Sequence, residues 1–232
     1  MLAVLETVAA CGPTSASEVS RLNGINRTVA HRLLRTLRER AYVRLVPGGY
    51  VVGPAVLPLA RAVEPDLVAV VTPELVALAS ETGETAVAHV IDGRDAVVVA
   101  QALGTRHLVR VAHEVGSRHA LTLGASGRVL LAFRPRQELE AIVRTAAHPE
   151  VLRRELAEAA ALGYAVSHDE LQAGAHGVAA PLRGGDGFAQ ASIALVVPTA
   201  RTSAATEHTE RLLIAAARIE ERLLGHLDRD AS

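Results

Sequence analysis

The segment that decides the fold of the first part of the chain spans residues 15–40 and has the sequence SASEVSRLNGINRTVAHRLLRTLRER. Ser15 precedes Glu18 by three residues, a spacing typical of a capping box that opens a helix, here over residues 16–22. Asn23-Gly24 ends that helix, because glycine readily adopts the left-handed conformation that helix C-termini favour. The first half of the segment therefore predicts a short helix that stops at a tight turn.

The second half of the segment predicts a longer helix with one apolar side. Asn26 can cap this helix, and the helical pattern continues to about Arg40. Apolar residues recur along it at helical spacing: Val29, Ala30, Leu33, Leu34 and Leu37. We expect this stripe to pack against neighbouring helices and the opposite side to face solvent.

The flanking segments complete the pattern of a winged helix-turn-helix. Residues 2–10 are mostly apolar and predict a first helix, which Gly12-Pro13 ends. Residues 42–46 and 50–52 are rich in β-branched and aromatic residues, and the turn at 47–49 joins them as a hairpin. Three helices followed by a hairpin, with a short turn between the second and third helices, match this motif.

The charge of the chain is unevenly distributed. The formal net charge is −1, but residues 1–60 carry seven arginines against three glutamates, a net charge of +4. The chain has no lysine, which excludes a P-loop and Schiff-base chemistry, since both need a lysine amine. A basic first part followed by an acidic remainder indicates an anionic partner that the first part binds.

The basic side of the predicted third helix suits contact with DNA. Its candidate contacts lie mostly in the N-terminal half, which enters the major groove in this motif: Arg27, Thr28, His31, Arg32 and Arg35. Arginine can fork onto guanine, and threonine can contact a thymine methyl group or a phosphate. Arg38 and Arg44 are better placed for phosphates, and Ser15 and Ser17 in the preceding turn are further candidate contacts.

A charged helix face can also be merely solvated. The candidate contacts on one side, the capping box and the wing together favour DNA binding over that simpler interpretation. The alternative function is a small-molecule or metal-binding sensor, or a small enzyme, whose basic first part is incidental. Because DNA affinity falls steeply with salt, the salt dependence of binding separates the two.

The rest of the chain predicts a domain that mixes helices and strands. Helices are predicted over residues 55–63, 66–82, 126–133, 137–144, 150–162 and 204–227. Strands are predicted over residues 85–91, 96–102, 107–112, 164–167, 177–182 and 190–197. The first two strands flank the turn Asp92-Gly93 and form a hairpin.

A series of segments resembles the IclR-type bacterial transcription regulators. The segments are residues 15–26, 28–37, 50–54, 81–85, 115–118, 127–133, 163–166 and 177–181. They span nearly the whole chain in order and at plausible spacing, and the series rather than any one segment carries the resemblance.

The resemblance implies an α+β protein with two domains. It implies a winged helix-turn-helix over residues 1–54, a linker helix over 55–65, and a GAF-like effector domain over 66–232, with an antiparallel sheet flanked by helices. The implied partners are operator double-stranded DNA, a small-molecule effector, and a second copy of the chain in a homodimer or homotetramer. The resemblance implies a regulator and no enzyme, with no catalytic residue and no cofactor.

The matched segments also place an effector pocket. The implied residues are Thr122, Gly124, Ser167, Gly177, Ala194 and Val196. We add Ala125 and Ser126 from the predicted helix start, and His89 from its place on a predicted strand. Several positions that are polar in better-known relatives are small or apolar here, among them Gly177, Ala194 and Val196. We therefore expect either an effector more apolar than the small carboxylates of those relatives, or a vestigial pocket.

The histidines and the single cysteine have plain interpretations. His113 with His119, and His168 with His176, could gather a metal, but their spacing is not that of a metal site and no cysteine joins them, so we predict none. His89 is expected to be a satisfied core histidine unless it lies in the pocket. We expect Cys11 to be a small buried helix residue.

Ser126 has two interpretations, both tied to a helix start. The segment 124–127 lacks the spacing of a nucleophile turn, so Ser126 is predicted to cap the helix that follows. The free amides of that helix start could bind an anionic group of the effector.

The chain is expected to act in the cytoplasm. One cysteine allows no disulfide framework, and no apolar run reaches the ~18 residues that a membrane span needs. Residues 8–11 resemble a lipoprotein cleavage box, but no arginine precedes them and Glu6 interrupts the apolar stretch.

Overall fold

The computed structural model describes residues 1–201 and 208–230. The chain divides into two compact units, Met1–Pro65 and Asp66–Ser232. None of the helices in the described ranges combines the length and the apolar character that crossing a membrane requires.

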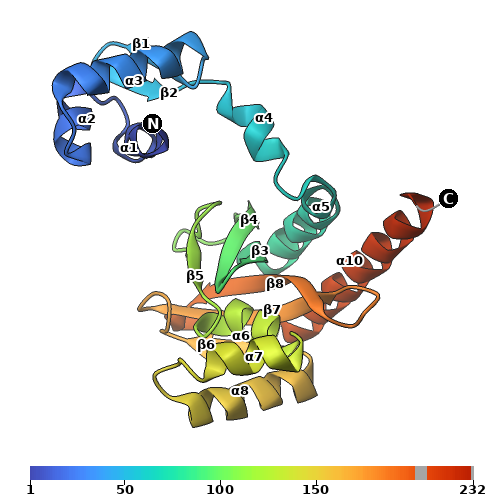
Figure 1. The fold of residues 1–232 in the computed structure, drawn as a ribbon. Coiled ribbons are helices and arrows are strands. Elements are labelled where there is room, and N and C mark those ends of the chain that lie inside the picture. The colour runs from blue at the N-terminus through green and yellow to red at the C-terminus, as the bar shows by residue number, and fades with distance from the viewer. Residues whose placement is uncertain (202–207, 231–232) are drawn as a thin grey trace. The chain divides into compact units, whose positions relative to one another are not determined.

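The first unit holds three helices, a two-stranded hairpin and a short fourth helix (Figure 1). The elements are α1 (Leu2–Cys11), α2 (Ala16–Asn23), α3 (Arg27–Glu39), β1 (Val43–Val46), β2 (Gly49–Val52) and α4 (Val56–Arg61). This order confirms the winged helix-turn-helix that the sequence predicts.

Side-chain caps set the limits of α2 and α3. The Glu18 amide donates to Ser15 Oγ at 3.2 Å, and the Ser15 amide donates to the Glu18 carboxylate at 2.8 Å, which completes the capping box. The Thr28 amide donates to Asn26 Oδ1 at 2.8 Å at the start of α3. Gly24 ends α2 with a φ of 62°, a left-handed conformation that favours glycine.

One apolar cluster holds the first unit together. Its buried members are Val4, Val8, Ala16, Val19, Ala30, Leu34, Leu37 and Val43. The stripe on α3 is therefore narrower than predicted: Leu33 is only partly buried and Val29 is 41% exposed. Val29 lies about 100° around the helix from Ala30 and falls outside the face that packs on α1 and α2.

The wing is anchored to the loop that follows α1. β1 and β2 pair in antiparallel register, and the amide of Thr14 donates to the Tyr50 carbonyl at 3.0 Å while the Tyr50 amide donates back at 2.9 Å. A Cβ on Gly49 would lie 2.6 Å from the Thr14 carbonyl, so only glycine allows this close approach.

The predicted burial of Cys11 is wrong, because its side chain is exposed. Cys11 is the last residue of α1, and Gly12 turns the chain away with a φ of 69°. The residue thus lies at the edge of the apolar cluster instead of within it.

The second unit is an antiparallel sheet between two helical layers (Figure 1). Its helices are α5 (Pro65–Thr82), α6 (Gly124–Ala132), α7 (Arg136–Val143), α8 (Pro149–Leu162), the 3-10 turn η1 (Thr199–Arg201) and α10 (Thr209–Asp230). Its strands are β3 (Thr85–Asp92), β4 (Asp95–Ala102), β5 (Arg118–Ala120), β6 (Ala165–His168), β7 (Ala175–Arg183) and β8 (Ala189–Pro198). The strand order is β5-β4-β3-β8-β7-β6.

The two faces of the sheet bury different side chains. Because strand side chains alternate, Ile193 and Leu195 of β8 pack in the cluster with α5 and α10, whereas Ala194 and Val196 join the cluster with α6. α7 and α8 cover α6 and complete the second layer (Figure 1). The face toward α6 carries the smaller side chains.

The predicted strand over residues 107–112 is wrong. The edge of β4 is paired instead with β5, where Val97 lies opposite Arg118. Residues 107–112 belong to a loop whose hydrogen bonds run to side chains and turns, such as the His113 amide to Gln101 Oε1 at 2.7 Å. The predicted terminal helix over 204–227 is observed as α10, and its first residues, 204–207, lie outside the described residues.

A buried ion pair joins the start of β3 to the turn after β8. Glu84 is 1% exposed, and Arg201 donates to its carboxylate through Nε at 2.7 Å and Nη2 at 2.8 Å. Arg201 Nη2 also donates to the Val109 carbonyl at 3.1 Å, so the pair holds the loop that ends near β5. A buried carboxylate without its partner is costly.

We predict that Arg201→Ala lowers the free energy of unfolding by about 3 kcal/mol, because it leaves the buried Glu84 with only the His107 imidazole, 3.8 Å away, as a possible countercharge. Arg183→Ala is the matched control: its pair with Glu220 is 48% and 17% exposed and is expected to contribute about 1 kcal/mol or less. Urea unfolding followed by circular dichroism measures both. Equal losses for the two variants would contradict the prediction.

Candidate DNA-binding surface and ligand pocket

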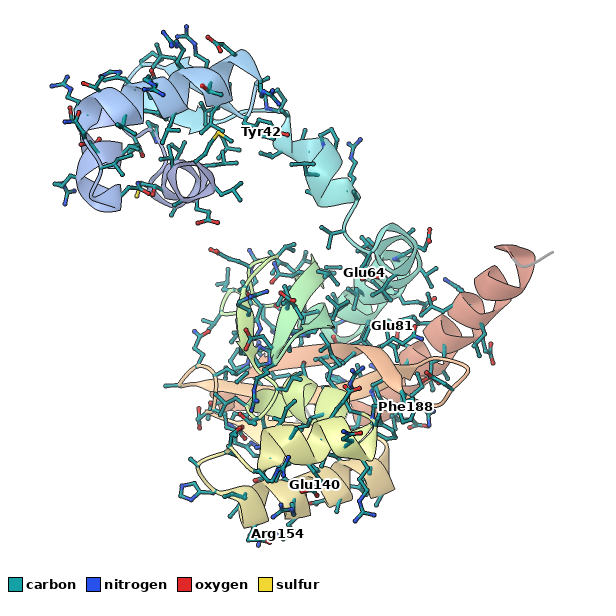
Figure 2. The ribbon with its side chains drawn as sticks, in the orientation of Figure 1. Tyr42, Glu64, Glu81, Glu140, Arg154 and Phe188 are labelled. Carbon is teal, nitrogen blue, oxygen red and sulfur yellow. The ribbon has the colours of Figure 1, made fainter. Side chains whose placement is uncertain are left out.

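The outward side of α3 carries a row of exposed basic and polar side chains. They are Arg27, Thr28, His31, Arg32, Arg35 and Arg38, all exposed. Figure 2 shows side chains with nitrogen tips extending outward from the α3 ribbon. Burial of Ala30, Leu34 and Leu37 on the other side fixes this orientation. The structure thus brings the predicted α3 contacts together on one surface.

Most of these guanidinium groups have no acidic partner. Arg35 lies 3.8 Å from Glu39 Oε1, and both side chains are more than 60% exposed, so the pair is weak. Within the described ranges, no ion pair is recorded for Arg27, Arg32 or Arg38. Arg44 on β1 is exposed as well. The positive charge of this surface is therefore available to an anionic partner.

The two predicted serine contacts differ in their surroundings. The Ser15 hydroxyl is engaged in the cap of α2, where it donates to Glu18 Oε2 at 2.7 Å and accepts from the Glu18 amide. Ser17 is exposed on the first turn of α2. The hydrogen bonds from Ser15 also hold the pKa of Glu18 below its usual range. The Ser17 hydroxyl is thus more available for a contact with DNA than the Ser15 hydroxyl.

The turn between α2 and α3 is held by hydrogen bonds from both sides. The Ile25 amide donates to the Ser20 carbonyl at 3.1 Å, and Ser20 Oγ donates to the Ile25 carbonyl at 2.6 Å. Asn23 Nδ2 donates to Thr7 Oγ1 at 2.9 Å and ties α2 to α1. These contacts fix α3 as a rigid element, which suits precise reading of a surface.

A pocket lies in the second unit between α6 and the face of the sheet that α6 covers. Seven of the predicted effector residues line it: His89, Ala125, Ser126, Ser167, Gly177, Ala194 and Val196. His113, Leu171, Gln172, Ala175 and His176 complete the lining. The space left between these side chains has a volume of about 30 Å³. The chain therefore brings distant predicted residues to one cavity.

Two predicted effector residues lie outside the lining. Thr122 is part of the turn before α6, and Gly124 is the first residue of that helix. The Gly124 amide donates to Glu170 Oε2 at 3.0 Å, so this part of the helix start already holds a carboxylate of the chain itself. A Cβ on Gly124 would lie 2.7 Å from Leu171 Cδ1, which shows how closely the β6–β7 loop approaches.

The prediction that Ser126 caps α6 is wrong. α6 begins at Gly124 with Leu123 at the N-cap position and no side-chain cap, so Ser126 lies inside the first turn. The Gly124 conformation, with a φ of 74°, starts the helix two residues earlier than the serine pattern indicates. Ser126 is buried and lines the pocket instead.

Arg128 of α6 is fully engaged next to the pocket. Its Nε donates to Glu155 at 3.0 Å, its Nη2 to Glu170 at 2.5 Å and its Nη1 to the Val166 carbonyl at 3.0 Å. These partners outweigh the cost of burial and raise the pKa of the Arg128 guanidinium. A larger open depression of about 760 Å³ between α8 and β6 is lined by this same network.

Three imidazoles cluster beside the pocket. The His89 ring lies 5.3 Å from the His119 ring and 6.4 Å from the His113 ring, centroid to centroid. Burial and the neighbouring imidazoles lower the pKa of His89 to about 3. Burial also lowers the pKa of His119 to about 4, and it lowers the pKa of His113. These rings are neutral at pH 7.

The expectation of a satisfied core histidine at position 89 is wrong. His89 is 1% exposed, yet neither ring nitrogen has a hydrogen-bond partner within the part of the chain that the structure describes. The register of β3 against β4 shifts between Ala88 and His89, and such irregularities are common next to functional sites. His89 therefore belongs to the pocket rather than to a sealed core.

The second histidine pair, His168 and His176, lies where β6 pairs with β7, and His176 lines the pocket. His168 Nδ1 and His176 Nδ1 are 2.6 Å apart, and His176 Nε2 lies 3.8 Å from Asp169. No group of three or more ligating side chains among the described residues is arranged to hold a metal ion.

Sequence reasoning missed the contribution of the β6–β7 loop to the lining. Leu171 and Gln172 come from this loop, and Ala175 from the start of β7. A hairpin was predictable there from the flanking strands, but nothing in residues 169–174 shows that the loop folds back over α6. The sequence pattern around His113 and His176 indicates at most a metal site and gives no sign that they line a pocket.

We predict that His89→Leu raises the melting temperature by about 3 °C at pH 7, because it removes two buried polar atoms without partners. The exposed His31→Leu is the control and is expected to shift it by about 1 °C or less. Differential scanning calorimetry of both variants measures the shifts. A lower melting temperature for His89→Leu would contradict the prediction.

A pH dependence follows from the same residues. Below pH 6.5 the unfolded chain protonates imidazoles that the folded chain keeps neutral, because the folded pKa values of His89 and His119 are about 3 and 4. The free energy of unfolding should thus fall as the pH drops from 7 to 4, and His89→Leu should reduce that slope. Urea titrations at several pH values measure it, and an unchanged slope would refute this contribution.

The comparisons with known proteins cover both units. A model of the C-terminal part of bacterial transcriptional regulators of the IclR type matches residues 60–220, and a model of the IclR helix-turn-helix domain matches residues 1–47. The chain is 29% identical to the HTH-type transcriptional regulator KipR of Bacillus subtilis (strain 168) over 179 residues, which make up 72% of this chain and 71% of that protein.

Solved structures agree with this assignment. An IclR transcriptional regulator from Alicyclobacillus acidocaldarius is 26% identical with a TM-score of 0.80, covering 95% of this chain and 97% of that one. An IclR homolog from Microbacterium hydrocarbonoxydans, complexed with 4-hydroxybenzoate, shares the fold at 24% identity, with a TM-score of 0.83 and 95% coverage of each chain. With both units matched by family models, the chain belongs to the IclR family of bacterial transcriptional regulators.

Proposed function

We propose that this regulator binds an operator through α3 and the wing, and that a small molecule in the pocket of the second unit controls its affinity for DNA. The observation that carries the proposal is the exposed row of arginines on α3, for which the described residues supply no acidic partner apart from the weak Arg35–Glu39 contact. The same chain holds a pocket lined by the residues that the family resemblance implies.

In this proposal α3 lies in the major groove. Arg27, Thr28 and Arg32 are on its N-terminal half, where they reach base edges, with arginine forking onto guanine. Arg38 and Arg44 contact phosphates, which position the protein without reading sequence. The small tip of the wing at residues 47–48 approaches the DNA backbone or the minor groove.

Two copies of the chain would bind together. A homodimer presents two copies of α3, so we propose a palindromic operator whose half-sites are about one helical turn or more apart. Homodimer and homotetramer both provide this pairing. The protein would act in the cytoplasm, where the bacterial chromosome lies.

In this proposal, binding of an effector in the pocket controls the affinity of the protein for DNA. The Microbacterium relative of the same fold holds 4-hydroxybenzoate, which supports a small-molecule effector for this chain as well. The effector must bind one arrangement of the dimer more tightly than the other, since equal affinity shifts nothing. The nine residues from His89 to Val196 singled out in the sequence are the proposed effector site, with Thr122 and Gly124 at its edge.

We predict that Arg32→Ala relaxes the preference at one base pair of the operator and costs about 1–3 kcal/mol of binding. Arg44→Ala should instead weaken binding to all sequences about equally and reduce the slope of log K against log salt by about 1. Footprinting on the DNA that flanks the coding region locates the operator, and fluorescence anisotropy with single-base variants measures the affinities.

The exposed Arg136→Ala in the second unit is the matched control and should leave DNA affinity unchanged. Unchanged operator binding by both Arg32→Ala and Arg44→Ala would refute the groove assignment. Salt-independent binding would favour the alternative of a sensor or enzyme with an incidental basic head.

A further inference from the structure

The wall of the pocket carries buried polar atoms without partners. Both ring nitrogens of His89, and Nε2 of His176, have no hydrogen-bond partner within the described part of the chain. His89 is 1% exposed and His176 is 6% exposed, so water gives little compensation. A buried polar group left unpaired costs free energy, and a ligand that supplies the missing hydrogen bond recovers it.

The pocket has no charged group to receive an ion. Its lining side chains include no arginine, aspartate or glutamate. Arg128, on the same helix as Ala125 and Ser126, is shared between Glu155 and Glu170, which leaves this triad with a formal charge of −1. The Gly124 amide at the start of α6 is occupied by Glu170 too. The arginine and the first amide of the helix start are therefore already paired with carboxylates of the chain itself.

The imidazoles do not supply a positive charge at neutral pH. His89 faces His113 and His119, and burial together with these neighbours holds its pKa at about 3. Asp95 acts on His119 in the opposite sense, but the pKa of His119 still falls to about 4. A bound carboxylate would therefore have to bring a proton with it, so its affinity would fall as the pH rises.

The remaining titratable groups come from the paired ends of β6 and β7 and from the loop between these strands. His176 lies against His168, with Asp169 3.8 Å away, and Asp169 also accepts from the Gly174 amide at 2.6 Å. Asp169 and Glu170 both come from the loop between β6 and β7, and Glu170 is paired with Arg128.

The rest of the wall is apolar and made of small residues. Ala125, Ala175, Ala194 and Val196 surround the space, and Leu171 closes it from the loop. A Cβ on Gly177 would lie 3.0 Å from Ser167 Oγ, so the missing side chain at this position is what keeps that part of the pocket open. The room between these side chains, about 30 Å³, suits a small group with its apolar part against the alanines.

We propose that the pocket binds a small uncharged molecule, in which a hydroxyl, carbonyl or amide group hydrogen-bonds to His89 and an apolar body packs against Ala125, Ala194 and Val196. A neutral imidazole both donates and accepts, so such a group satisfies it without any change of charge. This proposal rests on the proposed function, because it names the chemical class of the effector.

The experiment compares probes that share a body and differ in charge. Acetamide, benzamide and 4-hydroxybenzamide are matched with acetate, benzoate and 4-hydroxybenzoate, and benzylamine and Zn²⁺ alone serve as cationic probes. Isothermal titration calorimetry on the full chain without DNA, at pH 6 and pH 8, gives each dissociation constant. We expect at least one amide to bind about tenfold or more tightly than its carboxylate at pH 8. We also expect the affinity of that amide to be the same at both pH values.

Two variants of His89 test the contact itself. His89→Leu should weaken binding of the amide about tenfold while the protein stays folded by circular dichroism. His89→Gln keeps a donor and an acceptor and should retain affinity within about threefold. The exposed His148→Leu, which lies outside both proposed sites, serves as the control and should leave the dissociation constant unchanged.

Several outcomes would overturn the proposal. These are tighter binding of a carboxylate than of its amide at pH 8, tight binding of benzylamine, binding of Zn²⁺ that His89→Leu abolishes, and the absence of binding by all three amides. Operator binding is measured separately with the Arg32 and Arg44 variants. If the Arg32 and Arg44 variants bind the operator like the unmodified protein but an amide still binds the pocket, only the assignment of α3 to the major groove is refuted. If operator binding depends on these arginines but the pocket prefers a carboxylate, only the proposal of an uncharged ligand is refuted.

Discussion

The burial of Ala30, Leu34 and Leu37 is the constraint on which the function of this chain depends. These three side chains fix the rotation of α3 about its own axis, and the rotation decides which residues face outward. The same packing that stabilises the first unit thus also selects Arg27, Arg32 and their neighbours for solvent. A rotation that put Arg35 and Arg38 in the places of Leu34 and Leu37 would bury two guanidinium groups, which is costly without partners.

In the second unit, side chains alternate along β7 and β8, so that one face of the sheet carries core residues and the other face carries pocket residues. Ile193 and Leu195 fill the side of the sheet toward α5 and α10, and this side forms the larger apolar cluster. The opposite side carries Ala194 and Gly177, whose small size leaves room next to α6. One pair of strands therefore builds a tight core on one face and an open pocket on the other.

The local patterns of the sequence predict the first unit well. Caps at Ser15 and Asn26 and the turn at Gly24 act within a few residues, so their spacing alone determines the helices. Contacts between residues far apart in the sequence are harder to predict. The β6–β7 loop approaches α6 through Glu170, a residue more than forty positions from Gly124. The strand wrongly expected over 107–112 has a suitable pattern, but β5 occupies the edge where it would pair.

The positive charge of the α3 surface resides only on guanidinium groups, since the chain contains no lysine. Guanidinium stays protonated throughout the physiological pH range, and it binds phosphate and guanine through a planar fork. Lysine acetylation, which removes the charge of an ammonium group, has no target anywhere on this surface. Metabolic acetylation, a common way to weaken DNA-binding proteins, therefore leaves this regulator unaffected at the very face through which it would contact its operator.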